Sequence, residues 1–142
     1  MVIGTSKDDN PLHGTDSNDI FYGGAGNDTI TGNGGRDVAV YDTNAWGKDT
    51  IAATTGTMSI LFNGLTSSDV TSSLSGTTMT ISRKGASGQS VTVEGWNADT
   101  HNIVFGGTLS AFNTYLNAAS PTQTQRDAAR NEVWQKTGLL AG

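Results

Sequence analysis

The fold is decided by three consecutive nine-residue units: Gly14-Thr-Asp-Ser-Asn-Asp-Ile-Phe-Tyr22, Gly23-Gly-Ala-Gly-Asn-Asp-Thr-Ile-Thr31 and Gly32-Asn-Gly-Gly-Arg-Asp-Val-Ala-Val40. Each unit has Gly first, Asp sixth and an apolar residue eighth. The central unit fits the pattern G-G-x-G-x-D-x-U-x, in which U is apolar, at every defined position. A degenerate unit precedes them, with Asn10 at the Asp position and Leu12 at the apolar one. Its Gly4 lies ten residues before Gly14, so this turn carries an insertion.

The composition of one unit has a physical reason. Six residues form a turn whose backbone carbonyls converge, which requires conformations that Gly adopts at low cost. The remaining three form a strand whose eighth-position side chain points inward. Such a strand is too short to stand alone, so each coil depends on its neighbours. We therefore expect an inward stack of Leu12, Phe21, Ile30 and Ala39.

The negative charge is confined to the first third of the chain. Residues 1–49 hold eight acids, all Asp, against three bases, whereas residues 50–142 hold five of each, so the net charge of −5 lies in the first third. Stacked turns would bring these carboxylates together, which raises their pKa values unless a cation intervenes. Short carboxylates among glycines suit Ca²⁺, which takes oxygen ligands. The chain has two His and no Cys, so zinc would lack its usual ligands. The acidic balance also argues against a nucleic-acid partner.

These units resemble the repeats of the RTX (repeats-in-toxin) family, and Gly47-Lys-Asp-Thr-Ile51 resembles the G-x-D-T-I element that often follows them. The resemblance implies a parallel β-roll in which two units make one coil. Each Ca²⁺ ion then lies between two stacked turns and is bound by the sixth-position Asp of both and by turn carbonyls. Asp19 would pair with Asp37 on one edge, and Asp28 with Asn10 below and Asp49 above on the other.

The resemblance also implies which carbonyls complete the sites. They belong to Gly14, Asp16, Gly23, Ala25, Gly32 and Gly34, with Gly24, Gly26 and Gly35 from the facing half-sites. Thr15, Ser17 and Asn33 stand where the pattern has glycine, and Asn10 where it has Asp. These departures concern the outer sites and give a range of two to three ions.

Two other interpretations of the acidic segment are weaker. An EF-hand starting at Asp16 would place Ile20 at a ligand position and Phe21 where glycine is needed. A flexible Gly/Asn/Asp linker does not explain why Phe21 and Ile30 keep the same phase.

From Thr50 onward the pattern predicts short strands at 58–62, 77–82, 90–94 and 101–105, with a hairpin turn at 84–88. This order, ending in Ser90-Val-Thr-Val-Glu-Gly-Trp96, resembles the domain that flanks RTX repeats in many toxins and adhesins, over residues 46–105. We assign Trp96 to core or capping packing rather than to ligand binding.

Two helices are predicted at the end of the chain. Thr108 is the expected N-cap of the first, whose apolar residues Leu109, Phe112, Leu116 and Ala119 recur at helical spacing. The second is expected across 121–137, with Ser120 as its cap and Pro121 in its first turn. The tail, 136–142, is either part of an uncleaved type I secretion signal or a packed terminal helix.

The predicted fold class is all-β: a parallel β-roll continued by a sandwich-like or hairpin-like flank, with short C-terminal helices. The expected regions are a calcium-binding roll (4–51), a β-rich flanking or capping region (52–107) and a helical tail (108–142).

The predicted function is that of a calcium-binding RTX module from a secreted bacterial toxin, adhesin or exoenzyme. It would fold on calcium binding outside the cell or on the bacterial surface, as a monomer, and support type I secretion by that machinery. A ligand-binding adhesin module for a glycan or cell surface, or the non-catalytic tail of a secreted hydrolase, are the alternatives. We expect no enzyme activity, because His13 and His101 lie in no catalytic motif. No Sec-type signal peptide and no run long enough for a membrane span is visible.

Overall fold

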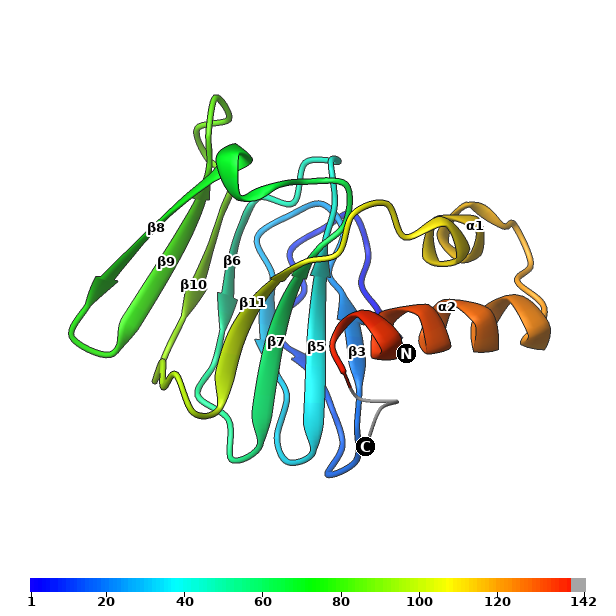
Figure 1. Cartoon of the computed structure of the whole chain (residues 1–142), viewed down its shortest axis with the longest axis horizontal. Coiled ribbons are helices and arrows are strands. Elements are labelled where there is room, and N and C mark those ends of the chain that lie inside the picture. Colours follow the sequence, from blue (N-terminus) through cyan, green and yellow to red (C-terminus); the bar gives the residue numbers. More distant parts are fainter. Residues whose placement is uncertain (139–142) are drawn as a thin grey trace.

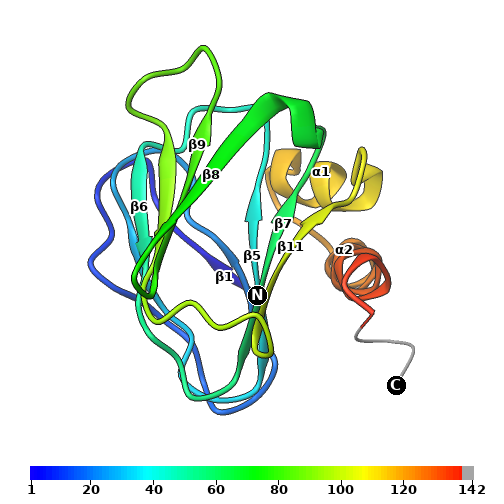
Figure 2. The same ribbon diagram turned by 60° about the vertical axis from the view of Figure 1, so that its left-hand side comes forward.

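The computed structural model describes residues 1–138, and these form two β-sheets that face each other, with two helices outside one of them (Figures 1 and 2). The five-stranded sheet has the order β1-β3-β5-β7-β11 and the six-stranded sheet the order β2-β4-β6-β10-β9-β8. The strands of the first are β1 (Val2–Ile3), β3 (Ile20–Tyr22), β5 (Arg36–Tyr41), β7 (Thr57–Phe62) and β11 (His101–Phe105). Those of the second are β2 (Leu12–His13), β4 (Thr29–Thr31), β6 (Lys48–Ile51), β8 (Val70–Ser75), β9 (Thr78–Arg83) and β10 (Ser90–Val93).

The first strands confirm the predicted parallel β-roll. Successive strands alternate between the two sheets, so each coil contributes one strand to each. Ile20 pairs with Val38 and Leu12 with Ile30, both at the expected eighteen-residue spacing. The last pairing of the roll, Ile30 with Ile51, is longer because the turn before β6 carries extra residues.

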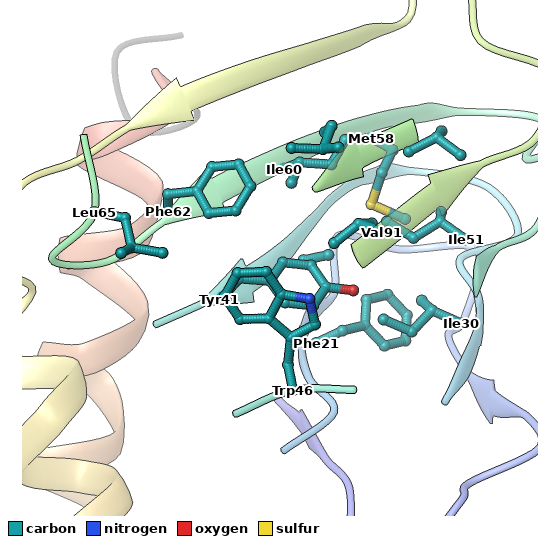
Figure 3. Packing of buried hydrophobic residues seen from close by; sticks show 13 residues of the cluster. Phe21, Ile30, Tyr41, Trp46, Ile51, Met58, Ile60, Phe62, Leu65 and Val91 are labelled. Atoms are coloured by element: carbon teal, nitrogen blue, oxygen red, sulfur yellow. The ribbon is translucent and has the colours of Figure 1, made fainter. Parts of the chain in front are cut away.

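The eighth-position side chains form the start of the core between the sheets, as predicted. Phe21, Ile30 and Ala39 are almost fully buried, and Leu12 packs against them. Figure 3 shows how the same cluster runs on past Ile51 of the roll into the flank, where Met58, Ile60, Phe62 and Val91 continue it. Burying this continuous apolar surface is what holds strands of two or three residues in place.

The flank extends both sheets of the roll, which makes it sandwich-like. Strands β7 and β11 add parallel neighbours to the five-stranded sheet. Strand β10 pairs in parallel with β6, and β9 and β8 follow as an antiparallel meander. The four strands predicted in this region are present. Strand β8 was not predicted, and a short 3₁₀ helix, η1 (Ser67–Asp69), precedes it.

Helices α1 (Ser110–Asn117) and α2 (Gln123–Lys136) cover the outer face of the five-stranded sheet. Phe112, Ala129 and Val133 are fully buried against Ile20, Val38 and Val40 of the roll. The helical tail therefore packs directly on the repeat strands.

Both predicted helix starts need correction. Leu109, not Thr108, is the N-cap of α1, and it has no side-chain cap. The N–H groups at this end instead donate to side chains from elsewhere: Leu109 to Asn63, and Ala111 and Phe112 to Glu132 of α2. Thr122, not Ser120, caps α2, because Thr122 and Gln125 form a capping box that leaves Pro121 outside the helix.

The last four residues of the candidate secretion signal, 139–142, lie outside the described residues. Among the helices that the structure describes, none combines the length and the apolar character needed to cross a bilayer.

Candidate calcium-binding turns

The sixth-position aspartates stack in two columns at the edges of the two sheets. Along the five-stranded sheet, the backbone N–H of Asp19 donates to Oδ1 of Asp37 at 2.9 Å. Along the six-stranded sheet, the N–H of Asp28 donates to Oδ1 of Asp49 at 2.9 Å. The structure thus brings together the aspartates that the sequence predicts as partners, with one carboxylate above the other.

The lower partner of Asp28 is Asp9, and the predicted assignment of Asn10 is wrong. The N–H of Asp9 donates to Oδ1 of Asp28 at 2.8 Å, whereas Asn10 is exposed. The N–H of Thr5 also donates to Asp9 Oδ2, just as that of Thr15 donates to Asp19 Oδ2. The inserted residue therefore lies after the aspartate, between Asp9 and Leu12, and counting back two positions from Leu12 reaches the wrong residue.

Glycine is required where neighbouring turns approach each other and the aspartate. A Cβ on Gly32 would lie 2.6 Å from Asp37 Oδ2. Gly35 has a φ of 85°, and a Cβ there would collide with the backbone of Ser17 in the turn below. The first position of the turn is thus kept open beside the carboxylate, and the fourth position allows the turns to stack.

Three carboxylate oxygens in these columns are buried without a hydrogen-bond partner among the described residues. They are Oδ2 of Asp28, Asp37 and Asp49, and each of these residues is only 1% exposed. A buried carboxylate oxygen without a partner is costly, unless the group is protonated or a cation lies against it. The oxygens therefore mark positions at which this fold is suited to a cation.

The pKa values of the same groups are displaced upward. Burial raises the pKa of Asp28 to about 6 and the pKa values of Asp37 and Asp49 to about 7. The carboxylates stacked next to them raise these values further, while the N–H groups that donate to them act in the opposite direction. A cation between the stacked turns would favour the charged carboxylates and remove this displacement.

The remaining ligands would have to be main-chain oxygens. Within residues 1–138, no three side chains of His, Cys, Asp or Glu gather around one point. All the residues whose carbonyls were predicted as ligands lie in the stacked turns: Gly14, Asp16, Gly23, Gly24, Ala25, Gly26, Gly32, Gly34 and Gly35. Two carboxylates with several carbonyls form an all-oxygen donor set, which is what Ca²⁺ prefers.

Where the turns depart from the glycine pattern, side chains take over. At the second position, Thr15 donates both its N–H and its hydroxyl to Asp19 Oδ2, at 2.6 and 3.0 Å. Asn33 adopts the left-handed conformation, with a φ of 62°, and its Nδ2 donates to the carbonyl of Gly14 at 2.9 Å. These substitutions keep the shape of the turn. They also use part of the hydrogen-bonding capacity of two predicted calcium ligands, the carboxylate of Asp19 and the carbonyl of Gly14.

A second ladder of hydrogen bonds, at the fifth position of the turn, was not predicted from the sequence. In each case a side-chain oxygen accepts a hydrogen bond of 2.8 Å from the N–H at the fifth position of the turn stacked above it. The three pairs are Asp8 with the N–H of Asn27, Asn18 with that of Arg36, and Asn27 with that of Lys48. The signal was present as Asp or Asn directly before Asp9, Asp19 and Asp28. This ladder holds the turns in register beside the aspartate columns.

Both columns end in apolar residues at the start of the flank. Met58 pairs with Asp37, and Val91 pairs with Asp49. Within the described residues, the stacked pairs of sixth-position aspartates are therefore three: Asp9–Asp28, Asp28–Asp49 and Asp19–Asp37.

Comparison with protein families agrees with the repeat pattern of these turns. Residues 4–39 match the family model of the RTX calcium-binding nonapeptide repeat, in four copies. Residues 4–39 are therefore RTX nonapeptide repeats, a type of repeat that binds calcium. The comparison with curated protein sequences found no match. Among solved structures, the AlgE6R3 subunit of the mannuronan C5-epimerase from Azotobacter vinelandii, determined in solution, is similar. It shares 20% sequence identity, with 84% of this chain and 85% of that chain covered and a TM-score of 0.40.

Proposed function

We propose that this chain is a calcium-triggered folding module of a secreted bacterial protein, itself without catalytic activity, which folds outside the cell and supports export by type I secretion. The observation that carries this proposal is the set of buried, unpartnered carboxylate oxygens on Asp28, Asp37 and Asp49. Without a cation, stacking these groups opposes folding at neutral pH. Calcium would supply the positive charge and accept the oxygens as ligands.

The chain's own residues then act as the switch. At low calcium, the like charges of the two columns and the entropy of a glycine-rich segment favour an extended chain, which suits passage through a channel. With calcium, the sixth-position aspartates hold neighbouring turns together and the apolar eighth positions can close into the core. Binding free energy thereby becomes folding free energy. The three stacked aspartate pairs favour three ions, the upper end of the predicted range, in a monomeric module.

Circular dichroism of the chain with EDTA and with calcium tests the proposal. We expect little β-structure in EDTA and recovery with a midpoint of about 10⁻⁴ to 10⁻³ M, typical of extracellular calcium modules. Magnesium should restore much less, because it demands octahedral geometry and loses its water reluctantly. Superimposable spectra in EDTA and in excess calcium would contradict the proposal.

A further inference from the structure

A polar cleft of about 440 Å³ lies between helix α1 and the start of the turn that joins β5 to β6, whose far end leads to Asp49. Its volume is within the roughly 300–1,000 Å³ of typical ligand sites. The cleft is lined by Asp42, Thr43, Asn44, Asn63, Gly64, Thr108, Asn113 and Asn117. Four of these eight residues are asparagines, and neither the sequence motifs nor the calcium chemistry accounts for that concentration.

The buried wall of the cleft is fixed by hydrogen bonds. Asn63 is 2% exposed; its Oδ1 accepts from the N–H of Leu109 at 2.8 Å, and its Nδ2 donates to Oδ1 of Asn113 at 2.7 Å. Asp42 is 8% exposed and accepts from the hydroxyl of Tyr22 at 2.8 Å and from the N–H of Asn44 at 2.9 Å. Helix α1 and the segment after β5 are thus held on either side of the cleft, so a ligand would meet a site that is already formed.

The lining chemistry selects one class of ligand. Its side chains offer amides, hydroxyls and one carboxylate, which both donate and accept hydrogen bonds. None of the eight lining residues is basic. A phosphate or a carboxylate ligand would therefore be repelled by the charge of Asp42, with no positive side chain in the cleft to offset the repulsion. None carries a large apolar side chain either, which disfavours a lipid or an aromatic ligand. A set of amide side chains can instead donate hydrogen bonds to, and accept them from, neighbouring hydroxyl groups on an uncharged ring.

From this cleft we infer a binding site for a neutral carbohydrate. Asn44 and Asn117 are exposed at its rim, while the part-buried Asn113 has its Oδ1 held by Asn63, which leaves its own amide group to donate. The site goes beyond the calcium function, but it needs the folded state, because α1 packs on strands of the roll.

An NMR titration of the isotopically labelled, calcium-loaded chain tests this inference. The probes are glucose, galactose and mannose as methyl glycosides, with glucuronate and inorganic phosphate as charged comparators. We expect at least one neutral glycoside to shift amide signals around residues 43–44, 63–64 and 113–117, with no comparable shift from the charged probes. Absence of these shifts for all three glycosides, or equal shifts from glucuronate, would overturn the site.

A pair of asparagine variants sharpens the test. Asn117→Ala removes an exposed rim amide and should weaken binding about threefold to tenfold, as expected for one or two hydrogen bonds. Asn131→Ala changes an exposed asparagine on α2 that does not line the cleft, and binding should be unchanged. Equal affinities of the two variants would also overturn the site. The calcium-induced circular dichroism signal, measured on the same samples, separates this result from a failure of the calcium function.

Discussion

Asp28 differs from the other sixth-position aspartates because it belongs to two stacked pairs. Its Oδ1 accepts from the N–H of Asp9, and its own N–H donates to Oδ1 of Asp49. Asp37 takes part in one such pair, since Met58 lies opposite it in the next coil. The two residues are almost equally buried, so a comparison between them isolates the number of turns that each one joins.

The first prediction concerns this difference. Asp28→Asn keeps the oxygen that accepts from Asp9 but removes the charge, and should raise the calcium midpoint about tenfold or more, as loss of a charged interaction implies. Asp37→Asn should raise it less. Asp16→Asn is the control, because this side chain is exposed and contributes only a predicted carbonyl. Calcium titrations followed by circular dichroism give the three midpoints, and equal shifts would contradict the stacking.

The second prediction concerns pH. Asp28, Asp37 and Asp49 have folded pKa values of about 6 to 7, above their ordinary value of 3.8. A group whose pKa rises on folding stabilises the fold at low pH, and this contribution is lost as the pH rises through the folded value. In EDTA, the roll should therefore become more stable as the pH falls from about 8 to about 5.

With calcium the trend should reverse, because protons compete with the ion for the same carboxylates. The β-structure signal in circular dichroism measures the trend in EDTA across this pH range, and thermal unfolding measures the trend in calcium. A calcium-free chain whose stability fell steadily on acidification would show that these aspartates do not control folding.

The aspartate columns could be predicted because a nine-residue period places Asp19, Asp28 and Asp37 without ambiguity. Asp9 could not, since Asp8, Asp9 and Asn10 are three consecutive oxygen-bearing residues and one inserted residue follows. Only the contact of Asp9 with Asp28 decides among them. The polar cleft was equally beyond the sequence, because Asp42, Asn63 and Asn113 are far apart along the chain.

At the level of elements, the calcium turns and the helical tail share the short strand β3 and the longer strand β5. Asp19 is followed directly by Ile20, and Asp37 by Val38, and both apolar residues pack under the helices. Phe112 of α1 also makes an edge contact with Tyr22, at 6.0 Å between ring centroids. Ordering the turns therefore also orders the surface on which α1 and α2 lie.

The third prediction follows from this shared strand pair. In EDTA the helices should lose their docking surface, so trypsin should cut after Arg126 and Arg130 at least about tenfold faster than in calcium. Val133→Asp would place a charge in a fully buried position and should release the helices even in calcium. Mass spectrometry of the fragments reads both results, and cleavage that did not depend on calcium would refute the coupling.

The strands of the flank differ in how far the sequence could predict them. Strands β9 and β10 alternate apolar and polar residues, and their hairpin was expected. Strand β8 reads Val-Thr-Ser-Ser-Leu-Ser and is exposed over most of its length, so it has no buried face to leave a pattern. Its place is set by pairing with β9. The N-cap of α1 was missed because side chains from elsewhere in the fold satisfy its first N–H groups, and that of α2 because a capping box at Thr122 lies two residues after the predicted Ser120.

At the scale of the whole molecule, charge and core are arranged along one axis. The net charge of −5 lies in the coils that contain the aspartate columns, whereas residues 50–142 are neutral overall. The flank closes both columns with Met58 and Val91. The hydrophobic core nevertheless runs through both parts without interruption. Folding of the roll and of the flank should therefore be one cooperative event, in which the bound ions supply the positive charge that the aspartate columns lack.

The last prediction is the number of ions in the whole chain and in two variants. The three stacked pairs give three ions, and Asp28 contributes to two of them, whereas Asp37 contributes to one. Native mass spectrometry at saturating calcium should therefore find three ions in the unaltered chain, one in Asp28→Asn and two in Asp37→Asn. Asp16→Asn should keep all three, because its carboxylate belongs to no column. Circular dichroism on the same samples verifies that each variant is folded. Equal losses from the Asp28 and Asp37 variants would mean that the ions are not shared between stacked turns in the way these columns require.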